Sequence, residues 1–235
     1  MTATLALCFD APMQSWGLRS RGVLRDTAPE PTKSGVVGLL GAAMGIERDD
    51  EARIAELAAL RLGVRVDREG LLERDYQTTQ NVPTTLGTGH RTVVSERYYL
   101  ADAVFLVLLE GPRPLLATLG AAVAAPRWPL CFGRRAFVPA RPVFCGLHDG
   151  GLDRTLREHR WLECRARALA VTGDQQRVTL RTVVDCGAGE PGAQPRHDVP
   201  LSFARGARRF APRAVRIGEV PLTEEMIPTG ELPCS

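Results

Sequence analysis

The stretch PTKSGVVGLLGAAMG, residues 31–45, places Lys33 and Ser34 at the start of a glycine-rich helical pattern. A lysine and a serine beside glycines suggest a P-loop, whose backbone amides cradle phosphates. The spacing argues against that motif, because aligning Lys33 and Ser34 with its last two positions puts Thr27 and Thr32 where its glycines belong. The first amides of any helix still attract an anion, since they lack intrahelical partners. We therefore expect a phosphate at Thr32, Lys33 and Ser34, without an NTPase fold.

Two further glycines, Gly38 and Gly41, lie inside the same predicted helix. Each interior glycine costs a helix about 1 kcal/mol relative to alanine. Two of them predict that another backbone comes close to this helix. We expect protein packing at these two glycines and keep the ligand for the helix N-terminus.

Tyr76, His90 and Lys33 are of the types that a metal-independent ribonuclease uses. In such a site the histidine would move protons and the lysine would stabilise the charged phosphorane. No local spacing brings the three together, so we favour a Tyr76 that stacks or packs and a His90 exposed on a hairpin. An endoribonuclease that processes precursor RNA remains the alternative function.

The four histidines and six cysteines show no metal-ligand spacing, and the cysteines form no C-x-x-C pair. We expect the cysteines to be small buried hydrophobic residues, and we expect no metal and no cofactor. The longest apolar stretch is too short and too rich in glycine to span a bilayer, and the N-terminus lacks the pattern of a signal peptide. These features predict a cytoplasmic protein without a membrane partner.

Arginine dominates the basic residues: of 30 lysines and arginines only Lys33 is a lysine, and the formal net charge is +3. Arginine suits bidentate contacts to phosphate and stacking on bases. Two stretches hold arginines without any acid, which indicates a basic stripe, although such runs are often only solvated faces. The first contains Arg127, Arg134, Arg135 and Arg141, and the second contains Arg205, Arg208, Arg209, Arg213 and Arg216.

Aromatic rings stand next to arginines at several places, the combination that single-stranded RNA requires for stacking and phosphate contacts. The predicted central strands carry no aromatic RNP pattern, so RNA would use the loops, the hairpin and the helix terminus rather than the sheet face. The pairs are Trp16 with Arg19, Arg21 and Arg25, Tyr76 with Arg74, Tyr98 and Tyr99 with Arg97, and Trp128 with Arg127.

The apolar periodicity predicts the scaffold that must position these residues. The order is strand, helix, strand, insertion, strand, helix, strand, which is that of a ferredoxin-like or RRM-like α+β domain over residues 1–147. Before the first helix, residues 10–32 form a long aperiodic loop, and such loops tend to be functional. The predicted strands cover about residues 2–9, 61–67, 102–110 and 141–146, and the helices lie within 33–45, 50–58 and 112–126.

The insertion, residues 74–100, is rich in threonine and poor in apolar residues. Two polar β arms with a tip at residues 83–89 would form a projecting thumb hairpin, which should order against a partner because an isolated hairpin is marginal in water. A plain exposed loop is the alternative. Residues 148–235 are predicted to form a smaller, partly irregular, β-rich region packed on the first domain, with short strands such as QRVTLRTVV and a loop over residues 185–198.

Four stretches in residues 1–147 closely resemble a known family, the CasD subunits of type I-E CRISPR Cascade complexes. They are DAPMQSWG at 10–17, PTKSGVVGLLGAAMGIERDD at 31–50, YYLADAVFLVLLEG at 98–111 and PRWPLCFGRRAFVPARPVF at 126–144. The resemblance implies a ferredoxin-like RRM domain with a thumb hairpin that binds the 5′ handle of the mature crRNA. It also implies that the subunit caps the backbone of CasC subunits, contacts the large CasA subunit and meets target DNA through the assembled complex.

The resemblance further implies that the handle site is lined by the loop around Gln14 and Trp16, the helix start, the thumb and the Gly133-Arg134-Arg135 turn. Combined with the basic and aromatic residues above, the candidate RNA contacts are Gln14, Trp16, Arg19, Arg21, Arg25, Thr32, Lys33, Ser34, Tyr76, His90, Arg97, Arg134, Arg135, Arg208 and Arg209.

The resemblance favours a subunit that does not cut RNA, because type I-E systems leave cleavage to a separate CasE nuclease, whereas relatives in another subtype cut the precursor themselves. Loss of cleavage on His90→Ala or Tyr76→Phe would identify the endoribonuclease. A third interpretation, an architectural subunit that does not touch RNA, predicts that Arg134→Ala with Arg135→Ala leaves assembly intact.

Overall fold

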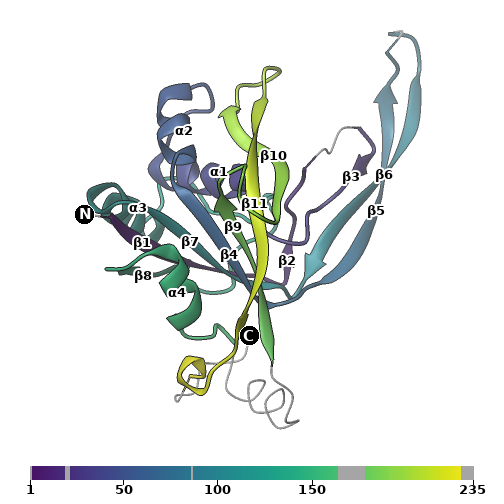
Figure 1. The fold of residues 1–235 in the computed structure, drawn as a ribbon. Helices are drawn as coiled ribbons and strands as arrows, with labels where there is room; N and C mark the ends of the chain where they lie inside the picture. Colours follow the sequence, from purple (N-terminus) through teal and green to yellow (C-terminus); the bar gives the residue numbers. More distant parts are fainter. Residues whose placement is uncertain (1, 19–21, 86, 164–177, 229–235) are drawn as a thin grey trace.

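The computed structural model describes residues 2–18, 22–85, 87–163 and 178–228 and shows a mixed α+β architecture with two sheets (Figure 1). The larger sheet has seven strands in the order β10-β11-β9-β4-β7-β1-β8, with neighbouring strands antiparallel. In chain order these strands are β1 (Thr2–Asp10), β4 (Arg61–Arg68), β7 (Val104–Pro112), β8 (Phe144–His148), β9 (Thr179–Cys186), β10 (Ala193–Ser202) and β11 (Arg209–Pro221).

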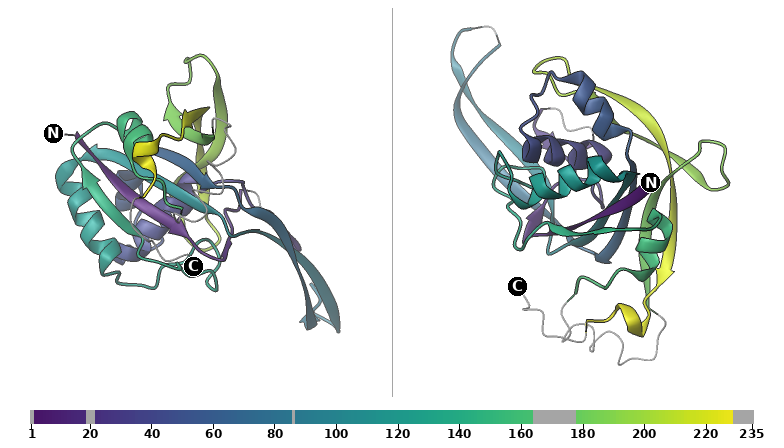
Figure 2. Two further views of the ribbon diagram at one scale, coloured as in Figure 1. Left: turned by 90° about the horizontal axis from the view of Figure 1, so that it is seen from below. Right: turned by 90° about the vertical axis from the view of Figure 1, so that its left-hand side faces the viewer.

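Helices cover both faces of this sheet (Figure 2). On one face lie α1 (Lys33–Met44), α2 (Glu51–Ala58) and α3 (Arg113–Ala124), and Leu5, Leu7 and Phe9 of β1 join the core beneath them. On the other face α4 (Leu152–Glu158) packs on Leu106 and Leu108 of β7. β7 is therefore buried on both faces, as its almost continuous apolar run predicts.

The first helix begins as its sequence predicts, because the side chain of Thr32 accepts a hydrogen bond from the backbone N–H of Gly35. The expected close approach at Gly38 and Gly41 is wrong, since a Cβ at either position would meet its nearest neighbour only at an ordinary 3.9 Å. The crowded glycine is Gly35, where a Cβ would lie 2.7 Å from the indole ring of Trp16. The glycine that close packing requires in this helix is therefore Gly35, and its close neighbour is the side chain of Trp16 rather than another backbone.

The other predicted helices are confirmed, with Asp50 capping α2 through the backbone N–H of Arg53 and α3 starting directly after Pro112. The short α4 was not predicted, and at 7 residues it has too few turns for a clear apolar period. No helix in the described ranges is long and apolar enough to cross a lipid bilayer.

The C-terminal strands continue the main sheet, because β9 pairs with β4 and places Val183 opposite Val64. The predicted loop over residues 185–198 is wrong in its second half, which forms the start of β10. Pro195 in that stretch indicated a loop, but β10 is an edge strand, where proline is tolerated. A 3-10 turn, η1 (Glu224–Met226), places Met226 in a small cluster with Trp161, beside the start of β9 and the end of β11.

The insertion forms the predicted hairpin, so the plain loop is wrong: β5 (Leu71–Pro83) and β6 (His90–Ala101) pair antiparallel and project from the body of the molecule (Figure 1). The loop over residues 10–32, predicted as aperiodic, contains two short strands, β2 (Met13–Gln14) and β3 (Leu24–Arg25). Both add to the other edge of β6 and make a second, smaller sheet with the thumb. We use "thumb" for β5, β6 and their connection.

Candidate nucleic-acid interface

Segments that are far apart in the sequence meet at a cavity of about 530 Å³ beside the N-terminus of α1. Its walls come from the loop that contains β2 and β3, the start of α1, the turn after Phe132 and the loop between β10 and β11. Three of the lining residues are arginines, against one aspartate, Asp26. We call it the arginine cavity; its lining includes Trp16, Arg25, Ser34, Gly133, Arg134 and Arg208.

Trp16 lines this cavity but cannot be a stacking platform for a base. Its side chain is 1% exposed, its ring stacks on Phe9 at 5.5 Å between centroids, and it also touches Phe132. One edge of the indole fills the space above Gly35. The prediction of base stacking by Trp16 is therefore corrected to a packing role that joins the loop to α1.

Gln14 is fully buried, so the prediction of a direct RNA contact by its side chain is also corrected. Its Nε2 donates hydrogen bonds to the backbone carbonyls of Phe9 and Ala103 at 3.2 and 2.8 Å. These bonds hold the loop after β1 against the start of β7. Gln14 thus positions the cavity wall without facing the cavity.

The turn at Gly133 approaches this loop so closely that only glycine fits. Gly133 has a φ of 89°, and a Cβ there would lie 1.8 Å from the backbone oxygen of Ser15. The backbone N–H of Ser15 in turn donates to the carbonyl of Phe132 at 3.0 Å. This contact fixes where the adjacent Arg134 emerges.

Lys33 does not face the cavity, because its partners are carboxylates of the C-terminal strands. Its Nζ pairs with Asp185 at 2.8 Å, and its backbone N–H donates to Asp198 at 2.8 Å. Arg213 also pairs with both carboxylates. The anion at the start of α1 is therefore Asp198, which corrects the prediction that Lys33 contacts an RNA phosphate. Of the predicted helix start, Thr32 and Ser34 line the cavity.

The buried aspartate stays ionised because of these partners. Burial alone would raise the pKa of Asp198, but hydrogen bonds and charge from Arg213, together with Lys33, lower it below its ordinary value. Sequence analysis missed Asp185 and Asp198, since both lie in a stretch predicted to be a loop. No local signal marks these two acids, because residues 148–235 contain nearly as many acids as arginines.

Arg134 combines a structural contact with a half-buried charge at the cavity wall. Its Nη2 donates to the carbonyl of Tyr98 at 2.8 Å, and its guanidinium lies 5.3 Å from the ring centroid of Phe137. Burial lowers the pKa of Arg134, and the neighbouring charges of Arg97 and Arg25 lower it further. Arg25 and Arg97 are partners in the pairing of β3 with β6. Three guanidinium groups therefore converge where the thumb meets the cavity.

In the folded protein, arginines of both acid-free sequence stretches form ion pairs with acids from other segments. Arg141 pairs with Asp10 at 2.7 Å, Arg209 pairs with Glu51 at 2.7 Å, and Arg216 pairs with Glu190 at 3.1 Å. Arg208 is exposed and lines the arginine cavity, and Arg135 is exposed beside Arg134. The predicted basic stripe is thus reduced to a small group around the cavity. Arg19 and Arg21 lie outside the described residues.

Tyr76 and His90 lie apart on the thumb. Tyr76 stands opposite Glu96, whereas His90 stands opposite Pro83 near the tip. The separation of six positions between His90 and Glu96 corresponds to about 20 Å along the strand. Because Lys33 is also buried against Asp185, the three residues do not assemble the ribonuclease site described as the alternative.

A family model described as CRISPR-associated protein (Cas_Cas5) matches residues 4–216. The CRISPR system Cascade subunit CasD of Escherichia coli (strain K12) is 34% identical over 160 residues, which cover 62% of this chain and 71% of CasD.

Two solved structures are similar over nearly the whole chain. A structure described as a crystal structure of a Cas protein has a TM-score of 0.72 and 38% identity, and the match covers 97% of this chain and 98% of that one. A chain of a CRISPR RNA-guided surveillance complex has a TM-score of 0.77 and 32% identity, with 95% and 92% covered. The resemblance predicted from the four sequence stretches is confirmed, and this chain belongs to the Cas_Cas5 family of CRISPR-associated proteins.

Proposed function

We propose that this chain is a CasD-type subunit of a Cascade surveillance complex and binds the 5′ handle of the crRNA in the arginine cavity. Its family, and its identity to the E. coli subunit, support a place in such a complex. The observation that carries the RNA site is the cavity, where three arginines from separate segments meet one aspartate.

The chemistry of the cavity suits a single-stranded phosphodiester backbone. Arg25 and Arg208 are exposed, so their guanidinium groups are free to form bidentate contacts to phosphate oxygens. The hydrogen bonds of Arg134 go to neutral carbonyls, so its positive charge is offset only in part, by the more distant carboxylate of Asp75. Ser34 adds a hydroxyl in the first turn of α1. We assign these four residues, with Arg135 at the rim, as direct RNA contacts.

We further propose that the thumb contacts both the RNA and a neighbouring CasC subunit. Arg97 faces the cavity side, next to Arg134. Leu72 and Tyr76, spaced to share the opposite face of β5, are 63% and 61% exposed. A hairpin with so little core of its own gains order when a partner covers such a face. Tyr76 and His90 would meet RNA or protein only in the assembly.

The whole subunit would cap the CasC backbone beside CasA and reach target DNA through the assembled complex, in the cytoplasm. We assign β1, β4, β7 and β8 with α1 and α3 to a ferredoxin-like domain, which the order β4-β7-β1-β8 supports. The separation of Lys33, Tyr76 and His90 supports a role without RNA cleavage.

The test is to purify the tagged protein from cells that carry its CRISPR locus and to sequence the 5′ ends of the RNA that comes with it. We compare the wild type with Arg25→Ala/Arg208→Ala and with a control, Arg53→Ala/Arg157→Ala, which removes the same charge from exposed sites on α2 and α4. Each lost charge-assisted contact should weaken RNA binding by about tenfold or more.

RNAs that share one repeat-derived 5′ end, together with other Cascade subunits, would support the proposal. The cavity variant should then lose most of its RNA while the control keeps it. An intact complex without RNA, or equal RNA in both variants, would overturn the cavity as the handle site.

A further inference from the structure

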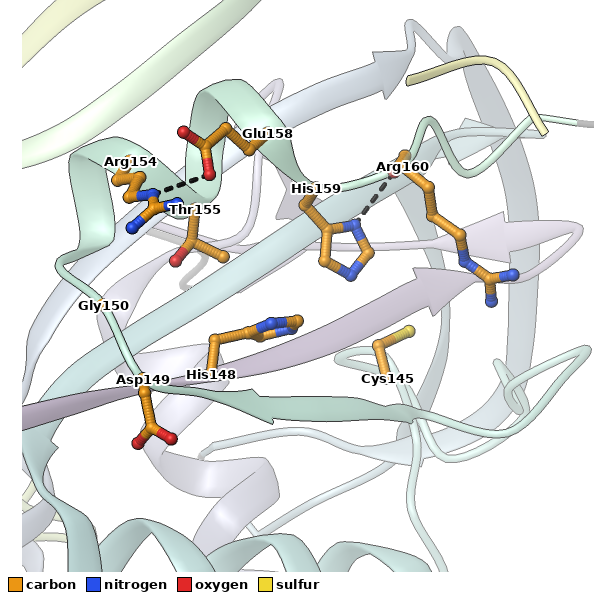
Figure 3. Close-up of a pocket in the computed structure, with 9 residues that line it drawn as sticks. All are labelled: Cys145, His148, Asp149, Gly150, Arg154, Thr155, Glu158, His159 and Arg160. Atoms are coloured by element: carbon orange, nitrogen blue, oxygen red, sulfur yellow. Dashed lines mark hydrogen bonds and ion pairs between the residues drawn. The ribbon is translucent and has the colours of Figure 1, made fainter. Parts of the chain in front are cut away.

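A second cavity, of about 470 Å³, lies between the end of β8 and α4 and shares no lining residue with the arginine cavity. Figure 3 shows Cys145 and His148 projecting from β8 into this space, with the His159 ring pointing back toward them from the end of α4. Arg160 borders the same space beside Cys145. We call it the Cys145 cavity.

A second cysteine lies directly behind Cys145. The register places Leu7 opposite Phe144 and Ala6 opposite Gly146, so Cys145 is the extra residue of a bulge in β8. Cys145 packs against the cluster beneath α4 that contains Cys8. The two cysteines therefore lie on the same face of neighbouring strands, because the backbone N–H of Cys8 donates to the carbonyl of Val143, two residues before Cys145.

The two thiols differ in access. Cys8 is 2% exposed, whereas Cys145 is only partly buried and lines the cavity. A small reagent that enters the cavity meets Cys145, whereas the buried Cys8 does not line the cavity. This difference in access is the one that a reactive thiol and a resolving thiol require.

The surroundings also divide the two thiols by charge. A hydrogen bond from Cys8, together with the charges of Arg160 and Arg141, lowers the pKa of Cys145 despite its burial. The same hydrogen bond, together with burial, raises the pKa of the Cys8 thiol far above its ordinary value. The thiolate is therefore favoured at Cys145, with Cys8 as its protonated neighbour.

The His159 imidazole does not compete for this role. His159 donates through Nδ1 to the carbonyl of Arg160 at 2.9 Å, and burial lowers its pKa to about 4, so it is neutral near pH 7. Within the described ranges, no group of three or more histidines, cysteines or acids is arranged to hold a metal ion. Thiol chemistry is what this arrangement supports.

We propose that Cys145 is a peroxide-reactive thiol and that Cys8 resolves it to a reversible disulfide between β8 and β1. The Cys145 thiolate attacks the terminal oxygen of a hydroperoxide, an S–O bond forms, the O–O bond breaks, and the alkoxide leaves and takes up a proton. Cys8 then loses its proton and attacks the Cys145 sulfur. The S–S bond forms, the S–O bond breaks, and hydroxide leaves with that proton as water. The two thiols lose two electrons, which the hydroperoxide accepts.

The test uses the full chain with Cys131, Cys164, Cys186 and Cys234 changed to serine, treated with hydrogen peroxide and followed by intact mass. The expected product has lost two hydrogens and regains them with a thiol reductant. With Cys8→Ser the product should instead carry one added oxygen that dimedone traps. With Cys145→Ser the remaining Cys8 should stay unmodified in the folded protein.

The matched control retains Cys131 as its single cysteine, because burial raises the pKa of that half-buried thiol and it lies outside the cavity. Cys145 should react at least about tenfold faster than Cys131. Equal rates would overturn the reactive thiol, and a product that keeps its oxygen while Cys8 is present would overturn the resolving role. Circular dichroism checks the fold of Cys8→Ser, and Cys8→Ala gives a second variant if the first unfolds.

Discussion

The side chain of Arg134 illustrates how single residues at the arginine cavity combine structure with charge. Its hydrogen bonds reach carbonyls of β6, so it joins the Gly133 turn to the thumb. These acceptors are neutral. Arg213, in contrast, forms ion pairs with the carboxylates of Asp185 and Asp198. Residue type alone therefore does not separate RNA contacts from structural ion pairs. The two are distinguished by the group that each guanidinium contacts in the folded protein.

At this scale we expect Arg208→Ala to reduce the salt dependence of RNA binding. Each phosphate contact contributes slightly less than one counterion to the slope of log K against log salt concentration. If Arg208 meets one phosphate, the slope should fall by about 0.7 for single-stranded RNA. Filter binding of a 5′-handle RNA by the purified complex at several salt concentrations measures this.

Arg209→Ala is the neighbouring control, because Arg209 pairs with Glu51 and does not line the cavity. Its slope should match that of the wild type. Identical slopes for Arg208→Ala and the wild type would show that Arg208 meets no phosphate.

His159 provides a prediction for pH. Burial, and the charges of Arg65, His148 and Arg160, lower its pKa from 6.5 to about 4. Between these values the unfolded chain binds the proton and the folded chain does not, so stability is complete above pH 6.5 and falls as the pH drops toward 4. The loss from this residue should reach about 3 kcal/mol.

Urea unfolding at pH 7 and at pH 4.5 tests this with His159→Asn, whose amide can still donate to the Arg160 carbonyl. The variant should lose less stability over this interval than the wild type, by about 2 kcal/mol. His197→Asn, at an exposed site on β10, should behave like the wild type. Parallel losses in all three proteins would contradict the assignment to His159.

Among the helices and strands, α1 contributes its first turn to the wall of the arginine cavity. Its glycines look alike in the sequence, but their surroundings differ: Gly35 is covered by Trp16, while Gly38 and Gly41 have room for a side chain. Its first backbone N–H, that of Lys33, donates a hydrogen bond to the carboxylate of Asp198 in β10. The element is therefore placed by one residue from the preceding loop and by one from a distant strand.

We expect Gly38→Ala to raise the free energy of unfolding by about 1 kcal/mol, because alanine is the better helix former and no contact becomes too close. Gly35→Ala, in the same helix, should instead lower the free energy of unfolding, since its Cβ would collide with the indole of Trp16. Chemical denaturation of both variants measures the difference in sign. Equal effects would mean that Trp16 moves away without cost.

For the whole molecule, the C-terminal strands complete the fold that the first half begins. β9 covers the edge of β4, and Val199 and Phe203 pack against the main core. Lys33 finds both of its carboxylate partners there. The seven-stranded sheet is continuous across the predicted boundary at residue 147.

We therefore expect a fragment of residues 1–163 not to fold cooperatively. It would expose the apolar edge of β4 and leave Lys33 without Asp185 and Asp198, and an open apolar edge promotes aggregation. Urea unfolding followed by circular dichroism, with the full chain as reference, measures this. A fragment with a sharp transition near the midpoint of the full chain would show an independent first domain.

Local sequence patterns determined the strands β1, β4 and β7 and the helices α1, α2 and α3, because the apolar period acts over a few residues. For the thumb they left a plain loop as the alternative. The four family stretches also indicated the segments that meet at the arginine cavity. Only the tertiary structure decided which arginines form ion pairs with carboxylates, that Trp16 and Gln14 are buried, and that β9 pairs with β4. The physical reason is distance along the chain: Lys33 meets Asp185 152 residues away, and no local period encodes such a pair.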